Sequence, residues 1–194
     1  GLGQSIGLPD SAFVEAGGGL LVAWGPNTDP ALARERLLEE TRLLPVVPER
    51  VAGEADWQNP RHRRFSVRLG ARHAALRQFH GDDDLRTWFE NSARVGRYLV
   101  STKAKDGRDS VRVLLSYDDE AKSPALAERL VGAGRVVVLT TTAHTRWNNL
   151  PVDRQAPLFL MLVNNLANHL TVPAKDPFNL TVGDPLVRLY TTFP

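Results

Sequence analysis

The residues whose types could act together in chemistry lie in one short segment after an apolar stretch. They offer an imidazole, a guanidinium, an indole and two amides: His144, Arg146, Trp147, Asn148 and Asn149. The indole could stack on a sugar or a peptide while the polar groups hydrogen-bond to it, which makes this loop the candidate ligand site. The alternative is structural: Trp147 and Leu150 fill the core, and the two asparagines shape the turn into the last helix.

The absence of cysteine limits the chemistry further. The chain has no cysteine among its 194 residues, which excludes a disulfide scaffold, a thiolate zinc site and a cysteine nucleophile. A divergent hydrolase would have to use His144 with a nearby acid such as Asp153. We therefore assign no catalytic residue, no metal and no cofactor, and keep the hydrolase as an alternative.

Two acidic runs could hold a divalent ion but fit structural roles better. The run His80–Asp84 lacks the spaced ligands of a calcium loop, and three consecutive aspartates cannot all point inward. We interpret it as a solvated loop in which Asp84 caps a helix that begins at Leu85. The run Asp118–Glu120 is typical of a hairpin turn.

The glycines, the other histidines and the arginines receive structural interpretations. Gly17–Gly19 precede a strand, whereas phosphate loops follow one, so we expect a helix end there and no nucleotide. Three isolated histidines are interpreted as surface or edge residues: His62, His73 and His169. Seven arginines lie within residues 50–77, but no nucleic-acid-binding motif accompanies them, so we expect a solvated surface and no nucleic-acid partner.

Hydrophobic periodicity predicts the elements that position these residues. With 42% hydrophobic residues, the chain can form one full domain. We predict strands at residues 20–24, 65–69, 95–100, 111–117, 125–131 and 135–142, the last three joined by hairpins. We predict helices at residues 9–16, 30–43 and 154–170 and an irregular insertion at about 50–90. No apolar run approaches the roughly 20 residues that span a bilayer.

Three segments in order carry a resemblance to a known family. They are Ala16–Val22, then Ser123–Arg129 with Gly132–Thr141, and finally Trp147–Pro151. Together they resemble the glutamine-amidotransferase-like domain of Bat-type (aerotolerance-associated) bacterial membrane proteins, especially the large planctomycete forms. His144 stands where these relatives usually have an acidic residue.

The resemblance implies an α/β fold with a flavodoxin-like layered sheet and flanking helices, of the class I glutamine-amidotransferase-like type. The family's strands before the glycine triplet are missing, so the sheet would be incomplete or rearranged. The domain would cover residues 1–172, and residues 173–194 would begin a following β-rich module. The location would be extracytoplasmic (periplasmic), in a membrane-anchored protein with a von Willebrand A-type region.

Because the usual cysteine nucleophile of that fold is absent, the resemblance implies a non-catalytic domain, a pseudoenzyme of the bacterial cell envelope. It would act as a scaffold or protein-interaction module, with other domains of its own parent chain or envelope proteins as partners. The alternatives are a carbohydrate- or peptide-binding module that uses residues 144–149, and the divergent hydrolase.

Overall fold

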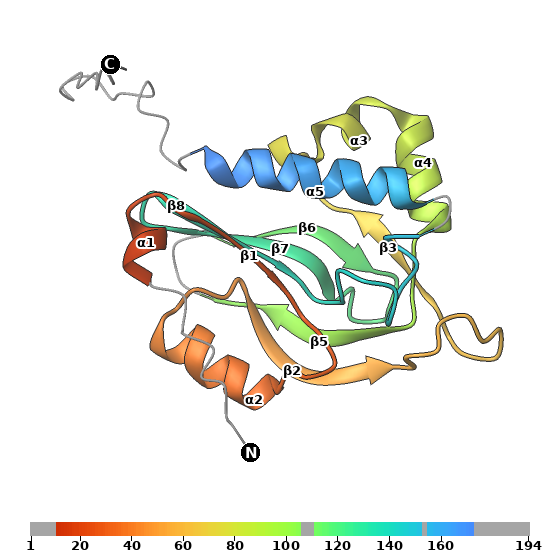
Figure 1. Cartoon of the computed structure of the whole chain (residues 1–194), viewed down its shortest axis with the longest axis horizontal. Coiled ribbons are helices and arrows are strands. Elements are labelled where there is room, and N and C mark those ends of the chain that lie inside the picture. The colour runs from red at the N-terminus through yellow and green to blue at the C-terminus, as the bar shows by residue number, and fades with distance from the viewer. Residues whose placement is uncertain (1–10, 106–110, 153–154, 173–194) are drawn as a thin grey trace.

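A six-stranded sheet forms the centre of the protein. The computed structural model describes residues 11–105, 111–152 and 155–172 (Figure 1). The strand order is β1-β8-β7-β6-β3-β4. The strands, in that order, are Gly19–Ala23, Gly134–Leu139, Pro124–Val131, Val111–Tyr117, Phe65–Leu69 and Arg94–Val95.

The pairing of these strands contradicts the expected flavodoxin-like layered sheet. In the described residues only β1 and β8 pair in parallel, and every other pair is antiparallel. A flavodoxin-like sheet is parallel, because a helix crosses over between successive strands. Here β6, β7 and β8 follow one another as hairpins, as predicted, and short turns leave no room for crossover helices. The fold is therefore α/β with a mixed, curled sheet.

Different elements cover the two faces of this sheet (Figure 1). One face carries the long helix α5 (Ala156–Thr171), with the 3₁₀ turn η2 (Ala74–Leu76) and helices α3 (Arg77–Gly81) and α4 (Asp83–Ser92). The other face carries a two-stranded antiparallel sheet of β2 (Val46–Gly53) and β5 (Arg97–Lys103). Helix α2 (Pro30–Ala33) and the π-helical η1 (Arg34–Glu40) lie on that side, and α1 (Ser11–Glu15) precedes β1.

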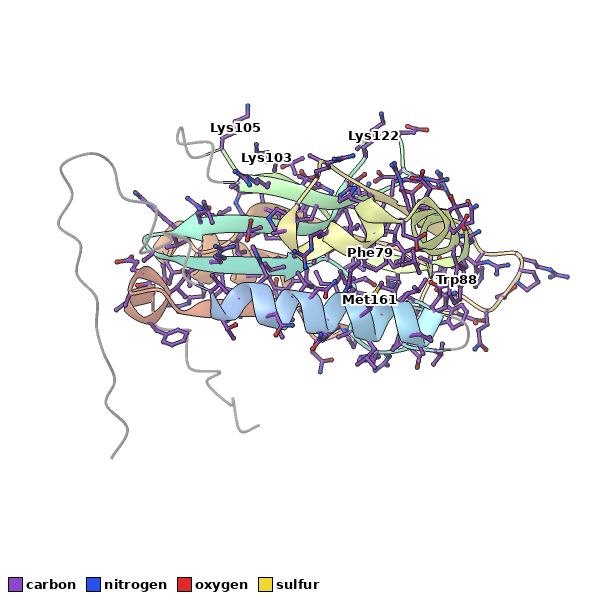
Figure 2. All side chains as sticks on the ribbon, turned by 90° about the horizontal axis from the view of Figure 1, so that it is seen from above. Phe79, Trp88, Lys103, Lys105, Lys122 and Met161 are labelled. Atoms are coloured by element: carbon purple, nitrogen blue, oxygen red, sulfur yellow. The ribbon has the colours of Figure 1, made fainter. Side chains whose placement is uncertain are left out.

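The central strands divide the core by their two-residue alternation. Val136 and Val138 of β8 belong to the cluster on the β2–β5 side, together with Trp24. Val137 and Leu139 belong to the cluster on the α5 side. The buried stripe of α5 completes that second cluster with Leu158, Leu162 and Leu166, and Met161 of the same helix packs against it (Figure 2). Successive residues of β7 or β8 therefore face α5 and β5 in turn.

The segment predicted to be irregular is largely ordered. Residues 50–90 include the end of β2, all of β3, η2, α3 and most of α4. The helix predicted at residues 30–43 begins as predicted, where the Asp29 carboxylate accepts the N–H groups of Ala31 and Leu32. Its winding then changes from α to π, and Leu32 is exposed. None of the helices in the described ranges is long and apolar enough to span a membrane. The predicted β-rich tail, 173–194, lies outside the described residues.

Candidate functional site

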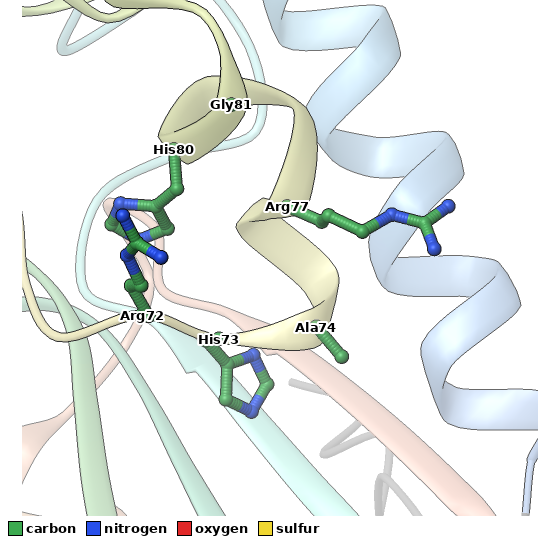
Figure 3. A pocket seen from close by; sticks show the side chains of 6 residues that line it. All are labelled: Arg72, His73, Ala74, Arg77, His80 and Gly81. Carbon is green, nitrogen blue, oxygen red and sulfur yellow. The ribbon is translucent and has the colours of Figure 1, made fainter.

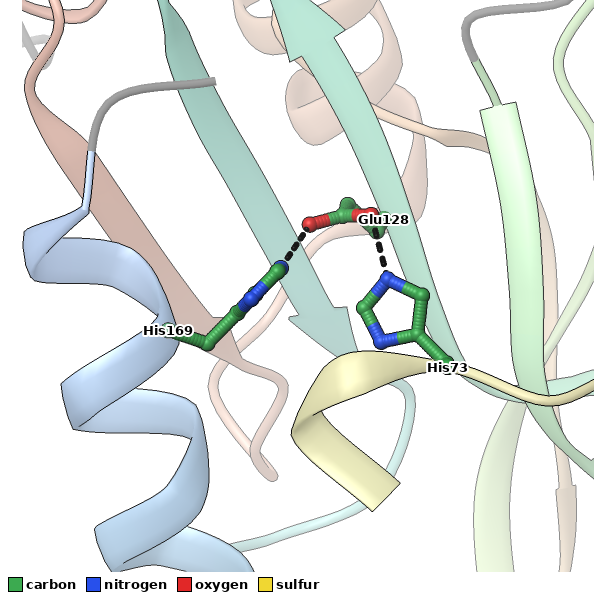
Figure 4. A group of neighbouring side chains, drawn as sticks. All are labelled: His73, Glu128 and His169. Atoms are coloured by element: carbon green, nitrogen blue, oxygen red, sulfur yellow. Dashed lines mark hydrogen bonds and ion pairs between the residues drawn. The ribbon is translucent and has the colours of Figure 1, made fainter. Parts of the chain in front are cut away.

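A buried carboxylate between two imidazoles is the main polar feature of the α5 side (Figure 4). Glu128 lies two residues after Leu126 in β7 and therefore shares its inward face. His169 follows Leu166 by three residues on the buried stripe of α5. His73 directly precedes η2 and caps it. The fold thus brings together residues from three distant parts of the chain.

Both oxygens of the Glu128 carboxylate are hydrogen-bonded. The Oε2 atom lies 3.0 Å from Nε2 of His73, and Oε1 lies 2.6 Å from Nε2 of His169. The three side chains expose 9% or less of their surface. Burial acts to raise the pKa of Glu128, but the hydrogen bonds from His169 and His73 outweigh it and lower the pKa to about 2. The carboxylate is therefore ionised at neutral pH.

Arg135 supplies a positive charge beside this group. It lies two residues before Val137 in β8 and so faces α5 as well. Its Nη1 atom lies 3.9 Å from Oε1 of Glu128 and within 3.0 Å of both ring nitrogens of His169. The guanidinium compensates the carboxylate charge, which lowers the cost of burying it. We call these four residues (His73, Glu128, Arg135 and His169) the His–Glu cluster.

The cluster has the donor types of a metal site, but its hydrogen bonds argue against one. Two imidazoles and a carboxylate lie within 4.8 Å of one another, and such donors suit several first-row transition metals. A histidine that binds a metal normally donates its other ring N–H to an acceptor. His73 does the reverse, because its Nδ1 accepts a hydrogen bond from the Ala75 backbone N–H at 3.3 Å. Its Nε2 then carries the proton and donates to Glu128.

The same bonds leave the cluster without a free base. Both ring nitrogens of His73 are engaged, and the nitrogens of His169 face Glu128 and Arg135. A general base needs a free lone pair within reach of its substrate. The arrangement therefore holds α5 and η2 against the sheet and does not present a reactive group.

The aromatic residue of the loop predicted to bind a ligand is buried. Trp147 is 2% exposed and Asn148 fully buried, so the indole is not available for stacking. The Asn148 side-chain amide donates to Thr141 and Thr142, and its Oδ1 accepts from the Leu150 N–H. The carbonyl of Trp147 accepts bonds from the backbone of Gly96 and Arg97. These contacts match the structural alternative, in which the segment fills the core and shapes the turn.

The remaining residues of that loop do not assemble a hydrolytic site. His144 and Arg146 are exposed, and Nδ1 of His144 accepts the Arg146 N–H at 3.1 Å. No carboxylate in the described part of the chain hydrogen-bonds to His144. Asp153, the acid considered for it, lies outside that part. So does Ser5, which stands in a G-x-S-x-G sequence at residues 3–7.

The acidic runs and the glycine triplet have the structural roles expected of them, except that a different aspartate caps α4. The cap of α4 is Asp82 and not Asp84: its Oδ1 accepts the N–H groups of residues 84 and 85. Asp119 closes the β6–β7 turn by accepting from Ser123 and from the Tyr98 hydroxyl. Gly17 ends α1 with a φ of 117°, a conformation that favours glycine.

The interpretation of His73 and His169 as surface or edge residues is wrong. The signal that points to the cluster is the two-residue alternation of β7, which places Glu128 on the same inward face as Leu126. An acid at such a position requires partners, because an unpaired buried charge is costly. His169 likewise falls on the apolar stripe of its helix. His73 carries no comparable signal, because it lies in a loop.

No protein-family model matches this chain, and no curated protein is similar to it in sequence. Solved structures do match in fold. A cytoplasmic protein from Salmonella typhimurium LT2 is 15% identical with a TM-score of 0.61, over 82% of this chain and 58% of that one. A second cytoplasmic protein from Salmonella typhimurium is 15% identical with a TM-score of 0.54, over 84% and 58%. A β-galactosidase from Rahnella sp. R3 is 16% identical with a TM-score of 0.49, over 84% and 20%.

These matches correct the expected location and class. This chain spans 58% of the length of the two Salmonella proteins. Both are named as cytoplasmic, which contradicts the expected extracytoplasmic, cell-envelope setting. The description as a flavodoxin-like, glutamine-amidotransferase-like domain finds no support among them either. The sequence resemblance to the Bat-type proteins is not tested by these matches and stays a prediction.

Proposed function

We propose that this chain is a non-catalytic domain that serves as a scaffold or protein-interaction module. The observation that supports this most is the closed state of the His–Glu cluster, whose imidazoles and carboxylate are all engaged with one another, with Arg135 or with the backbone. Such a cluster stabilises the domain and offers nothing to a substrate. The absence of cysteine is consistent with this role.

A hydrolysis screen tests the non-catalytic half of the proposal. Ester, peptide and glycoside substrates are incubated with the wild-type protein, with Glu128→Gln and with Ser5→Ala. We expect no turnover above the buffer rate in any of them. Saturable turnover in the wild type that disappears in a variant with a wild-type circular dichroism spectrum would overturn the proposal.

A pull-down tests the interaction half. The domain is the bait, and separately expressed segments of the native gene product are the prey, at about 100 mM salt so that weak charge pairing is partly screened. We expect at least one segment to be captured and competed off by free domain. Failure to capture any segment would count against an interaction module.

A further inference from the structure

A pocket of about 380 Å³ lies on the α5 side, where the chain turns from β3 into α3 (Figure 3). Six residues line it: Arg72, His73, Ala74, Arg77, His80 and Gly81. Its volume falls in the range of small-molecule sites. None of these lining residues is acidic, and two are arginines.

The two arginines of the pocket are not paired with a carboxylate of the described residues. Arg72 and Arg77 are exposed, and neither forms an ion pair with any of them. Figure 3 shows the Arg72 side chain beside the His80 ring, with Arg77 pointing toward α5 on the other side. The Nε2 atom of His80 is buried without a hydrogen-bond partner. Such a group is rare in folded proteins and is satisfied when a ligand or water bonds to it.

The carboxylates closest to the pocket in sequence belong to the start of α4 and form no ion pair with these arginines. Asp82 caps the helix, and Asp83 and Asp84 lie exposed in its first turn. Glu128 lies behind His73, accepts hydrogen bonds from the two imidazoles and has the Arg135 guanidinium beside it. The His73 ring at the wall of the pocket has both nitrogens engaged, so it positions the wall and does not bind. The guanidinium groups of the two arginines are therefore available to bind an anionic ligand.

We propose that this pocket binds a phosphate group, either free or carried by a small molecule. Guanidinium groups match the oxygens of phosphate through paired hydrogen bonds, and two of them balance a dianion. Arg77 lines the same pocket and points toward α5, and its exposed side chain must rotate to reach a group held by Arg72 and His80. This inference goes beyond the proposed function and does not depend on it, because a binding module and an enzyme could both use such a pocket.

Calorimetric titration of the whole protein tests the phosphate proposal, with inorganic phosphate and phenyl phosphate as ligands. The buffer contains about 50 mM sodium chloride, because charge interactions are little screened at that concentration. We expect one saturable site that is weakened at least about tenfold by Arg72→Gln or Arg77→Gln and lost in the double variant. Arg61→Gln is the matched control, since Arg61 is exposed and lies outside the pocket. Thermal melting of every variant confirms that it is folded.

The titration arms distinguish the sources of the phosphate. Tighter binding of phenyl phosphate identifies a phosphorylated small molecule, and equal binding identifies the free ion. No saturable binding up to about 10 mM, or binding that the double variant retains, overturns the proposal. Succinate binding as tightly as phosphate also overturns it, because the class would then be carboxylate. A failure here leaves the hydrolysis screen unaffected, since the two experiments change different residues.

Discussion

The burial of a single carboxylate, that of Glu128, sets the polar chemistry of the α5 side. A lone charge at 2% exposure is expensive, and here two imidazole N–H donors and a guanidinium offset that cost. Replacing the carboxylate by a neutral amide would leave one of these two imidazole donors without an acceptor.

Glu128→Gln is therefore expected to destabilise the protein by about 3 kcal/mol at pH 7, the scale for breaking a buried charge pair. The amide can accept from one histidine but turns a donor toward the other. Urea denaturation followed by tryptophan fluorescence measures the loss. Glu120→Gln is the control, because Glu120 is exposed and its neutralisation should change the free energy of unfolding by less than about 0.5 kcal/mol.

The stability difference between the wild type and Glu128→Gln should also depend on pH. The folded pKa of Glu128, about 2, lies below its ordinary value of 4.5, so its contribution is present above pH 4.5 and is lost as the pH falls toward 2. The stability difference between wild type and Glu128→Gln should shrink over that interval. A difference that stays constant from pH 7 to pH 3 would show that the ionised carboxylate is not the stabilising species.

Metal removal should leave the protein unchanged, because the Ala75 N–H fixes His73 in the tautomer that donates to Glu128. We expect elemental analysis to find far less than one equivalent of any transition metal. We also expect the same melting temperature with EDTA and with added zinc. A zinc-dependent rise in the melting temperature that His169→Gln abolishes would make the cluster a metal site.

Among short elements, the segment from Thr140 to Leu150 connects several parts of the fold. Asn149 accepts from the Arg94 N–H and donates to the Ser92 carbonyl, which ties the segment to the end of α4. Asn148 bonds within the segment, and Trp147 fills the space beside β5. A sequence of polar and aromatic residues that suggests a ligand loop here acts as an internal connector.

Asn148→Ala should destabilise the protein by about 2–3 kcal/mol, because it leaves the buried Leu150 N–H and the Thr142 carbonyl without their partner. Chemical denaturation measures the change. Asn164→Ala on the exposed face of α5 is the comparison and should stay within about 0.5 kcal/mol of wild type. Equal effects of the two substitutions would mean that the buried amide network contributes little.

Periodicity predicts elements well where one face of a strand is apolar. The predicted ranges of β3 and β6 agree with the structure at both ends. It fails for β2, which carries Pro48, a register shift and two exposed charged residues, and so does not alternate regularly. It also misses η2 and α3, which are too short for a helical period to be recognised.

At the scale of the whole molecule, strand order and direction were not accessible from the sequence. Hairpin turns indicate antiparallel neighbours for β6, β7 and β8, and that part is confirmed. No local pattern shows that β3 pairs with β6 or that β1 lies beside β8, because both pairings join distant segments. The His–Glu cluster shows the same contrast between local and long-range information. The alternation along β7 places Glu128 on the inward face, but only the tertiary fold brings His73 to it.

Gly134→Ala tests how the N-terminal helix is attached to this sheet. A Cβ at Gly134 would lie 2.0 Å from the Val14 carbonyl oxygen and 2.3 Å from that of Gly18, so α1 must move away. We expect a loss of about 1–3 kcal/mol, the usual cost of overpacking. Gly25→Ala is the matched control, because no atom lies within 4 Å of its Cβ position. Thermal melting measures the loss of stability, and hydrogen exchange at Val14 reports the displacement of α1.

The parallel pairing of β1 with β8 has a consequence for synthesis on the ribosome. Gly19 pairs with Arg135 of β8, the last strand in the described residues, so β1 acquires its neighbour only after every other described strand has been made. Until then Leu20, Leu21 and Val22 are exposed in the nascent chain, where a binding chaperone can reach them. Contacts between such distant segments form slowly, so we expect β1 to dock late in folding.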